Sequence, residues 1–287
     1  MPEKILKWFI PYVMIQSLGF YFAKNSLNYS SPYVFMAMRY LLAAGLLLFF
    51  SRRVLVNKWT GTIAAFTSFS TLTWILGLRY VSPGDSAVLN STGPLFAIPL
   101  AVVIVRERPV IWEVIGALVG FSGVLIYSVT LSHGSLLEGT VLSLLAAMTW
   151  ACFSVLFRKT RNEDPASIVG SQYLLGSVPF IFGALLFSSV QINQNFLIDL
   201  VYTAVPGGAV QLYLWNRMLQ VEDVAKITTM TFAIPALTTA IQSLETVALP
   251  NPTAIVGALV MFVGVYISSR SRLAKSRRID EKKKMMT

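Results

Sequence analysis

Hydrophobic residues along this chain gather in ten long runs, separated by short polar or charged stretches. Each run is close to the ~20 residues that cross a bilayer as a helix, and lipid offers open backbone no other hydrogen-bond partner. The strict alternation of apolar and polar residues that marks membrane barrels is absent. The pattern therefore predicts an all-α membrane protein with ten transmembrane helices. The runs cover residues 5–27, 32–50, 59–79, 84–105, 110–131, 136–157, 165–188, 197–218, 224–248 and 251–269.

The sequence also repeats itself, because Pro94 and Pro235 lie 141 residues apart in similar surroundings. Nine of the thirteen residues in Gly116–Ser128 recur in Gly257–Ser269. A copy with five spans, an odd number, places the next copy upside down in the membrane. We therefore expect two inverted five-helix repeats around a central cavity, an architecture that permits alternating access. The predicted units are a first repeat over residues 1–131, a second over residues 132–269 and a basic cytoplasmic tail over residues 270–287.

Composition and charge support a membrane location. The chain is 55% hydrophobic and 13% charged, with a mean hydropathy of +0.66, whereas soluble domains carry about 25% charged residues. Of the 23 Lys and Arg residues, 20 fall on the same predicted side as the two termini. The positive-inside rule then predicts a multi-pass protein of the cell membrane with both termini in the cytoplasm. Because the net charge of +10 reflects this orientation, we expect no nucleic-acid partner.

The sequence offers little for covalent or metal chemistry. Its one cysteine, Cys152, excludes an intramolecular disulfide, and no cluster of metal-ligating residues accompanies it, so we expect no metal and no cofactor. An intramembrane enzyme is disfavoured because the spans lack an HExxH motif or a His–Asp–Glu group. A non-transporting scaffold or sensor is disfavoured because the loops are short. A carrier is the interpretation that remains.

Short motifs follow one another in a fixed order along the chain, and some of them recur in the second half. They are Leu18-Gly19, Pro32, Arg39, Ala43-Ala44, Pro94-Leu95-Phe96, Arg106-Glu107, Gly116 and Gly123-Val124 in the first, and Trp150-Ala151, Trp215-Asn216, Gly257 and Gly264-Val265 in the second. In this order the chain resembles the EamA-type branch of the drug/metabolite transporter (DMT) superfamily. The resemblance implies ten helices around a central cavity and export or uptake of small metabolites. Glu245 departs from the pattern, because it stands three residues early in the repeat register relative to Glu107.

Aromatic and polar residues inside the predicted spans are the candidate substrate contacts, since polar groups there face protein or water rather than lipid. They are Tyr12, Gln16, Trp74, Asn90, Trp150, Tyr173, Tyr213, Trp215 and Thr231. Trp74 and Trp215 hold matched positions in the two repeats. Two alternatives stay open: the aromatic rings can serve packing or a headgroup belt, and the hydroxyls can cap carbonyls that proline frees.

Pro94 and Pro235 are the candidate hinge or gate residues, because a proline within a helix removes a hydrogen bond and loosens the turn before it. Among the charges in the spans, Arg39 is the most deeply placed. We favour a snorkelling or ion-pair role for Arg39 over substrate contact. Glu245 favours an end cap or ion pair over a proton site, and strong coupling through a central carboxylate is not expected. Glycines in residues 116–123 and 257–264 favour close helix packing, within the chain or in a homodimer.

The predicted function is transport of small neutral or zwitterionic metabolites, with export of amino acids or related compounds as the first choice. The expected partners are the small-molecule substrate and membrane lipid. A transporter of phosphorylated or nucleotide sugars is the alternative. It is disfavoured because Arg39 is the one deeply placed cation in the spans, and such anions need several.

Overall fold

The computed structural model describes residues 3–129, 137–246 and 251–269, and these residues are almost entirely helical. Eight helical segments among them are long and apolar enough to cross a membrane, and α3 and α13 complete the ten predicted spans. The first half contains α1 (Glu3–Ser26), α2 (Pro32–Ser51), α3 (Lys58–Gly77), α4 (Pro83–Asn90), α5 (Gly93–Val105) and α6 (Ile111–Ser128). The second contains α7 (Leu137–Phe157), α8 (Pro165–Leu186), α9 (Gln194–Ala204), the π-helical segment η2 (Val205–Val210), α10 (Gln211–Val221), α11 (Val224–Met230), α12 (Ala233–Thr246) and α13 (Pro252–Ser269).

Several helices begin at a capping side chain followed by proline, which fixes where each span enters the membrane. The Ser31 hydroxyl accepts a hydrogen bond from the Val34 N–H at the start of α2. The Asp164 carboxylate accepts one from the Ser167 N–H at 2.8 Å at the start of α8. Both helices then start on a proline, which lacks the N–H that a first turn would leave unpaired.

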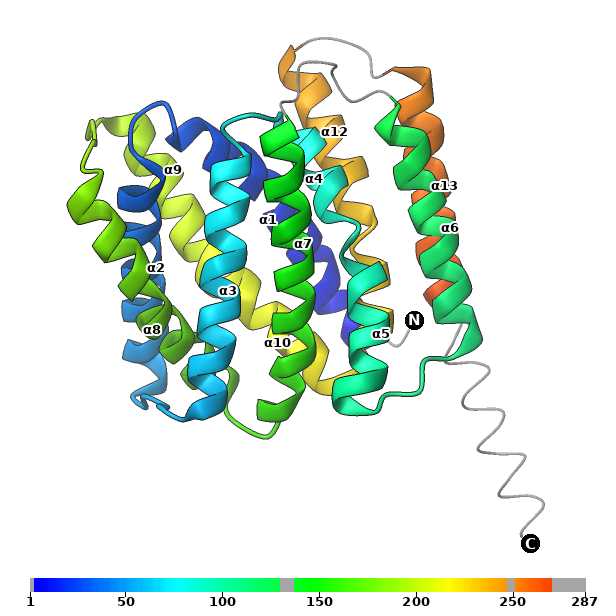
Figure 1. Cartoon of the computed structure of the whole chain (residues 1–287), viewed down its shortest axis with the longest axis horizontal. Coiled ribbons are helices and arrows are strands. Elements are labelled where there is room, and N and C mark those ends of the chain that lie inside the picture. The colour runs from blue at the N-terminus through cyan, green and yellow to red at the C-terminus, as the bar shows by residue number, and fades with distance from the viewer. Residues whose placement is uncertain (1–2, 130–136, 247–250, 270–287) are drawn as a thin grey trace, which may run out of the picture.

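The repeats meet antiparallel along α6 and α13, which Figure 1 shows side by side at one edge of the molecule. A Cβ added at Gly116 would lie 2.7 Å from the carbonyl oxygen of Gly264, and one at Gly123 would lie 2.7 Å from that of Gly257. Gly116 matches Gly257 in the repeat, and Gly123 matches Gly264, so the two contacts are equivalent, as a pseudo-two-fold axis requires. The glycines therefore bring two helix backbones of one chain together.

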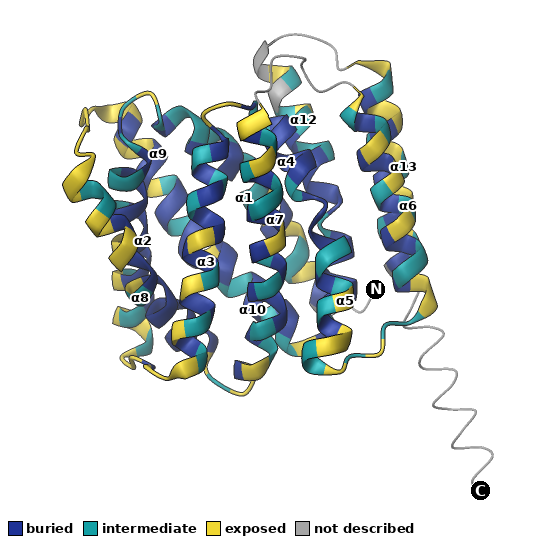
Figure 2. Ribbon diagram, viewed as in Figure 1, coloured by how far each residue is buried: buried dark blue, intermediate teal, exposed yellow. Residues whose placement is uncertain are grey.

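The buried residues lie toward the inside of the bundle and the exposed ones on its outside and at its ends (Figure 2). Large apolar residues are common among the exposed ones, and small polar residues among the buried ones. Phe49 and Leu186 are 72% and 78% exposed, whereas Ser171 and Thr229 are fully buried. So much exposed apolar surface would aggregate in water, but acyl chains cover it in a bilayer.

Three spans are interrupted near the middle of the molecule. α4 gives way to α5 just before Pro94, and α11 gives way to α12 just before Pro235, at matched positions of the repeats. The third interruption is η2, where Pro206-Gly207-Gly208 widens the helical turn between α9 and α10. Interrupted helices expose backbone groups inside the bundle, which lipid-facing helices cannot do.

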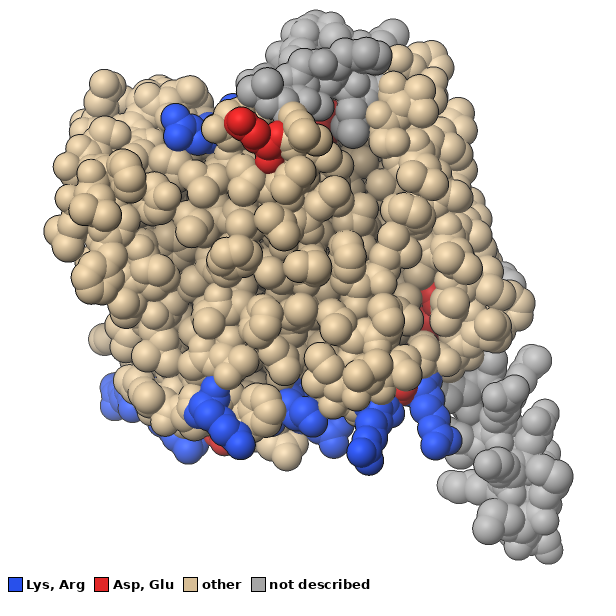
Figure 3. Space-filling view, in the orientation of Figure 1, with Lys and Arg blue, Asp and Glu red and all other residues tan. Residues whose placement is uncertain are grey.

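Lys and Arg side chains gather at one end of the molecule, over the loops around residues 52–57, 106–110 and 158–164 (Figure 3). We call this end the basic face. Its residues in these loops and beside them are Arg52, Arg53, Lys58, Arg106, Arg108, Arg158, Lys159 and Arg161. The opposite end contains Lys24, in the last turn of α1, and Arg79, just after α3.

Candidate substrate cavity

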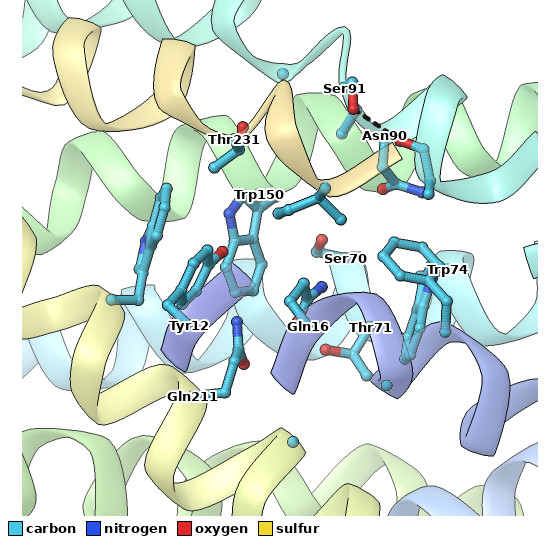
Figure 4. A pocket seen from close by; sticks show the side chains of 18 of the residues that line it. Tyr12, Gln16, Ser70, Thr71, Trp74, Asn90, Ser91, Trp150, Gln211 and Thr231 are labelled. Carbon is cyan, nitrogen blue, oxygen red and sulfur yellow. Dashed lines mark hydrogen bonds between the residues drawn. The ribbon is translucent and has the colours of Figure 1, made fainter. Parts of the chain in front are cut away.

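A cavity of about 100 Å³ lies between the two repeats. Its walls come from α1, α2, α3, the α4–α5 break, α7, α9, η2, α10 and the α11–α12 break. At roughly 10–15 Å³ for each water molecule, it would hold about seven to ten waters, which is the size of a small metabolite. Figure 4 shows Tyr12 and Gln16 of α1 among the side chains that line it, together with Trp74, Asn90 and Trp150.

Most of the predicted substrate contacts meet at this cavity. Those that line it are Tyr12, Gln16, Trp74, Asn90, Trp150, Trp215 and Thr231, and Pro94 lines it as well. The sequence brings them there from six separate segments, because each lies on the inward side of its helix. Tyr173, Tyr213 and Pro235 lie outside the lining.

Tyr173 and Tyr213 have other partners, although Tyr173 also forms a hydrogen bond with Arg39 of the cavity lining. The Tyr173 ring packs edge-on against Tyr40, with centroids 4.8 Å apart, so α8 closes on α2 through this pair. Tyr213 lies under the guanidinium of Arg217, with 5.9 Å from Cζ to the ring centroid. The sequence could not separate these two tyrosines from Tyr12, because all three interrupt apolar runs in the same way.

Aromatic rings line the cavity at two levels along α1. At one level Tyr12 stacks on Trp215 with centroids 5.1 Å apart, and Trp150 lies 5.9 Å from the same ring. At the other, Phe20 meets Trp74 edge-to-face at 5.5 Å. Eight residues of α1 separate the two levels, or about 12 Å along a helix. A solute between them would contact an aromatic surface at each end.

The hydroxyls at the helix breaks mostly serve the backbone, as the capping alternative predicts. Ser91 Oγ donates to the Ala87 carbonyl at 2.8 Å, and Thr231 Oγ1 donates to the Thr228 carbonyl at 2.6 Å. The Asn90 amide nitrogen donates to the Ser86 carbonyl at 2.8 Å. In each of these bonds the side chain is the donor. The oxygen atoms of the three side chains can therefore still accept hydrogen bonds from a solute.

Arg39 also lines the cavity, and its surroundings differ from the snorkelling or ion-pair role that the sequence favoured. The side chain is 8% exposed; Nε donates to the Thr203 carbonyl at 2.9 Å and Nη2 to the Gly207 carbonyl at 3.0 Å. Its guanidinium carbon lies 5.6 Å from the centre of the Trp74 ring. Within residues 3–129, 137–246 and 251–269, no carboxylate forms an ion pair with it. Neutral groups therefore hold a buried cation at the cavity wall.

The η2 segment explains why carbonyls are available to Arg39. A π-helical turn displaces the usual i→i+4 pairing and leaves carbonyl oxygens open. A Cβ at Gly208 would lie 2.9 Å from the Thr203 oxygen, so a glycine suits this close approach. Pro206-Gly207-Gly208, within a predicted span, is the sequence signal that could have indicated this irregular turn.

Asp199 is a buried acid that the sequence analysis did not consider, although it lies in the predicted run 197–218. It is 2% exposed, and one oxygen accepts a hydrogen bond from the Asn25 side chain at 2.8 Å. It lies near the end of the molecule opposite the basic face and does not line the cavity. The prediction for Glu245 concerns a side chain outside those described.

At the basic face, charged residues join the two repeats. Arg158 Nε lies 2.8 Å from Glu107 Oε1, and its Nη2 lies 3.6 Å from Asp223. Glu107 also accepts a hydrogen bond from the Val224 N–H at 3.0 Å. Burial raises the pKa of Glu107 above its ordinary value, although the positive charge of Arg158 opposes this shift. Lys226 and Glu222 form a further buried pair at 3.6 Å.

These features define a multi-helix membrane transporter with a central solute cavity. A family model for the EamA-like transporter family matches residues 4–129 and again residues 137–270, so the chain belongs to this family. This confirms the resemblance, the helical transporter fold and the carrier rather than enzyme interpretation.

Individual relatives agree with the family. The chain is 44% identical over 234 residues to an "Uncharacterized transporter in sor 3'region" of Acidianus ambivalens, covering 82% of this chain and 92% of that protein. It is 22% identical to a "Probable amino-acid metabolite efflux pump" of Salmonella typhimurium, covering 89% of this chain and 91% of that one. One solved crystal structure matches with a TM-score of 0.78 at 16% identity, covering 97% of this chain and 99% of that chain, which shows the shared fold.

Proposed function

We propose that this chain exports small metabolites that are neutral overall or zwitterionic, with amino acids and related compounds as the first class. The observation that supports this most directly is the cavity of about 100 Å³, lined by aromatic, amide and hydroxyl groups. The similarity to a protein named as an amino-acid metabolite efflux pump supports the same class. Nucleotide or phosphorylated sugars fit less well, since Arg39 is the charged residue of the described lining and phosphates need several donors.

Transport in this proposal proceeds by alternating access. The cavity residues of α2 and α3 lie in the halves of those helices that are remote from the basic face, whereas those of α7 lie in the half nearer to it, so the cavity occupies the middle of the bundle. The Glu107–Arg158 and Arg158–Asp223 pairs close the basic face in this conformation. Flexing at the breaks before Pro94 and Pro235 would close the opposite end and open the basic face. We assign the basic face to the cytoplasm of a cell-membrane protein, by the positive-inside rule.

The test is uptake of radiolabelled amino acids and amines into proteoliposomes, with and without a pH gradient. We expect saturable transport of at least one small amino acid by the wild-type chain. Alanine at Trp74, Asn90 or Trp215 should lower its initial rate by roughly tenfold, or ~1.4 kcal/mol of lost contact. Trp112→Ala is the matched control, because Trp112 is 46% exposed on the outside of α6. Normal transport by all three cavity variants would contradict the proposed site.

A further inference from the structure

The charge at the cavity wall is not balanced by a neighbouring acid. Arg39 is held by two carbonyls, by the Met36 sulfur at 3.7 Å from Nη1 and by a hydrogen bond with the Tyr173 side chain, and none of these is an anion. The described lining contains no Asp or Glu. A buried cation without a counter-charge is costly in a membrane interior. Its presence at a solute cavity therefore indicates that an anionic partner binds there reversibly.

The repeat supplies an internal comparison for this position. Arg39 aligns with Gln172, since the following residues, Tyr40 and Tyr173, correspond. Gln172 is fully buried, and its amide nitrogen donates to Thr67 Oγ1 at 2.6 Å. A neutral amide therefore satisfies the same place in the second repeat. The positive charge at Arg39 is an addition at the cavity wall that helix packing at this position does not require.

The surroundings of Arg39 further suit a carboxylate. A guanidinium has five N–H donors in a planar fork that matches a carboxylate, and the carbonyls of Thr203 and Gly207 occupy one donor each on Nε and Nη2. The neighbouring Trp74 indole N–H has no hydrogen-bond partner in the described structure, so it offers another donor at this level. About 12 Å away along α1, the Tyr12, Trp150 and Trp215 rings offer an apolar and π-rich surface.

We infer that Arg39 is the specificity-determining residue of the transporter, and that its solutes carry a carboxylate. The carboxylate binds Arg39 beside Trp74, and the apolar part of the solute extends toward Tyr12 and Trp215. An ammonium group on the solute is accommodated but not required. This inference rests on the proposed function: it narrows the neutral and zwitterionic solutes to those with a carboxylate, adds small monocarboxylates, and excludes amines and amides of the same size.

The test measures binding to the purified chain in lipid nanodiscs by tryptophan fluorescence, because Trp74 lies beside Arg39. Three probes of equal carbon skeleton separate the groups: L-leucine, L-leucinamide without the carboxylate, and 4-methylpentanoate without the ammonium group. We expect saturable binding of leucine and of 4-methylpentanoate, and binding of leucinamide that is weaker by roughly 10- to 100-fold, the scale of a charge-assisted hydrogen-bonded pair.

Arg39→Gln should remove this preference, and Arg39→Lys should retain part of it. Arg39→Gln copies the residue of the second repeat, so the fold has a precedent for it. Arg217→Gln is the matched control, since Arg217 also lies over a tryptophan, 5.7 Å from the Trp8 ring, but outside the cavity. If the Arg39 variants do not fold, the comparison of the three probes on the wild-type chain still tests whether binding requires a carboxylate.

Several outcomes would overturn the inference: equal affinity for leucine and leucinamide, an Arg39→Gln chain that keeps the preference, or no binding of either carboxylate probe. These are distinguishable from failure of the proposed function. Amino-acid transport without a carboxylate preference overturns the role of Arg39 alone. Binding of 4-methylpentanoate without transport of any amino acid supports Arg39 and overturns the proposed substrate class.

Discussion

Arg158 at the basic face and Lys24 at the opposite end occupy equivalent places in the two repeats. Each stands near the end of the first helix of its half, and each donates to carbonyl oxygens at the end of the third span or in the turn that follows it. The acceptors correspond at the repeat spacing of 141 residues: Leu78 with Leu219, and Val81 with Glu222. The duplicated backbone therefore provides one basic clamp at each end of the cavity.

The two clamps differ in what surrounds the cation. Arg158 has carboxylates from both repeats, Glu107 at 2.8 Å and Asp223 at 3.6 Å. Lys24 has carbonyl partners only, as far as the described residues extend. Buried ion pairs are costly to break one side at a time, whereas neutral hydrogen bonds contribute about 1 kcal/mol each. In the proposed alternating-access cycle, these side chains would give the two conformations unequal energies and favour the one in which the basic face is closed.

The largest expected effect comes from removing the two cations in turn. Arg158→Ala leaves Glu107 buried without its partner, so we expect a loss of about 3 kcal/mol in the free energy of unfolding. Lys24→Ala removes bonds to neutral carbonyls at a half-buried site, and we expect about 1 kcal/mol. Denaturant unfolding followed by tryptophan fluorescence measures both. Equal losses would mean that the ion pairs do not distinguish the two ends.

Accessibility provides a second measurement on the same variants. In a chain with Cys152→Ala and Thr231→Cys, a membrane-impermeant thiol reagent reports whether the cavity can be reached, because Thr231 lines it. Arg158→Ala should raise the labelling rate from the basic face several-fold, and Lys24→Ala should not. Labelling from the basic face that is already fast in the wild-type chain would contradict closure at that end.

An intermediate effect is expected from Glu107→Gln, and its sign depends on pH. The folded protein raises the pKa of Glu107, so the folded state binds this proton more tightly than the unfolded state. The stability that protonation contributes is present below the ordinary value of about 4.5 and is lost as pH rises through the higher folded value. At neutral pH, Glu107→Gln should therefore be as stable as the wild type or slightly more stable, while the basic face labels faster.

Below pH 4.5 the wild-type carboxyl is protonated in both states, so the stability advantage of Glu107→Gln should shrink. Unfolding of both chains across this pH range checks the sign. Glu163→Gln is a suitable control, because Glu163 forms a solvent-exposed pair with Arg53 at 3.8 Å. If Glu107→Gln instead became progressively less stable than the wild type as pH rises, the pair with Arg158 would outweigh the cost of burying the Glu107 carboxylate.

The contrast between the clamps also shows what the sequence could and could not predict. The lengths of the apolar runs predict ten spans, and proline chemistry predicts the breaks at Pro94 and Pro235. The repeat register predicts that Trp74 and Trp215 hold equivalent places. All three can be read along the sequence. The Arg158–Glu107 pair joins loops of different repeats, and nothing local to either residue indicates the other. The same is true of Arg39, whose partners are carbonyls that only the π-helical turn of η2 makes available.

The smallest effect expected, and the sharpest test of the comparison, comes from giving Lys24 the acid that Arg158 already has. Asp223 corresponds to Ser82 at the repeat spacing, and Ser82 caps α4 by accepting a hydrogen bond from the Asp85 N–H at 3.1 Å. Aspartate is an equally good N-cap, so Ser82→Asp should fold. Lys24 donates to the neighbouring Val81 carbonyl at 3.2 Å, which places the new carboxylate within reach of its ammonium group. We expect the pair to contribute at most about 1 kcal/mol at this half-exposed site and to slow transport two- to fivefold by favouring closure of the end opposite the basic face. Ser82→Asn keeps the cap without the charge and should transport at the wild-type rate, so equal slowing by both variants would assign the effect to the cap rather than to Lys24.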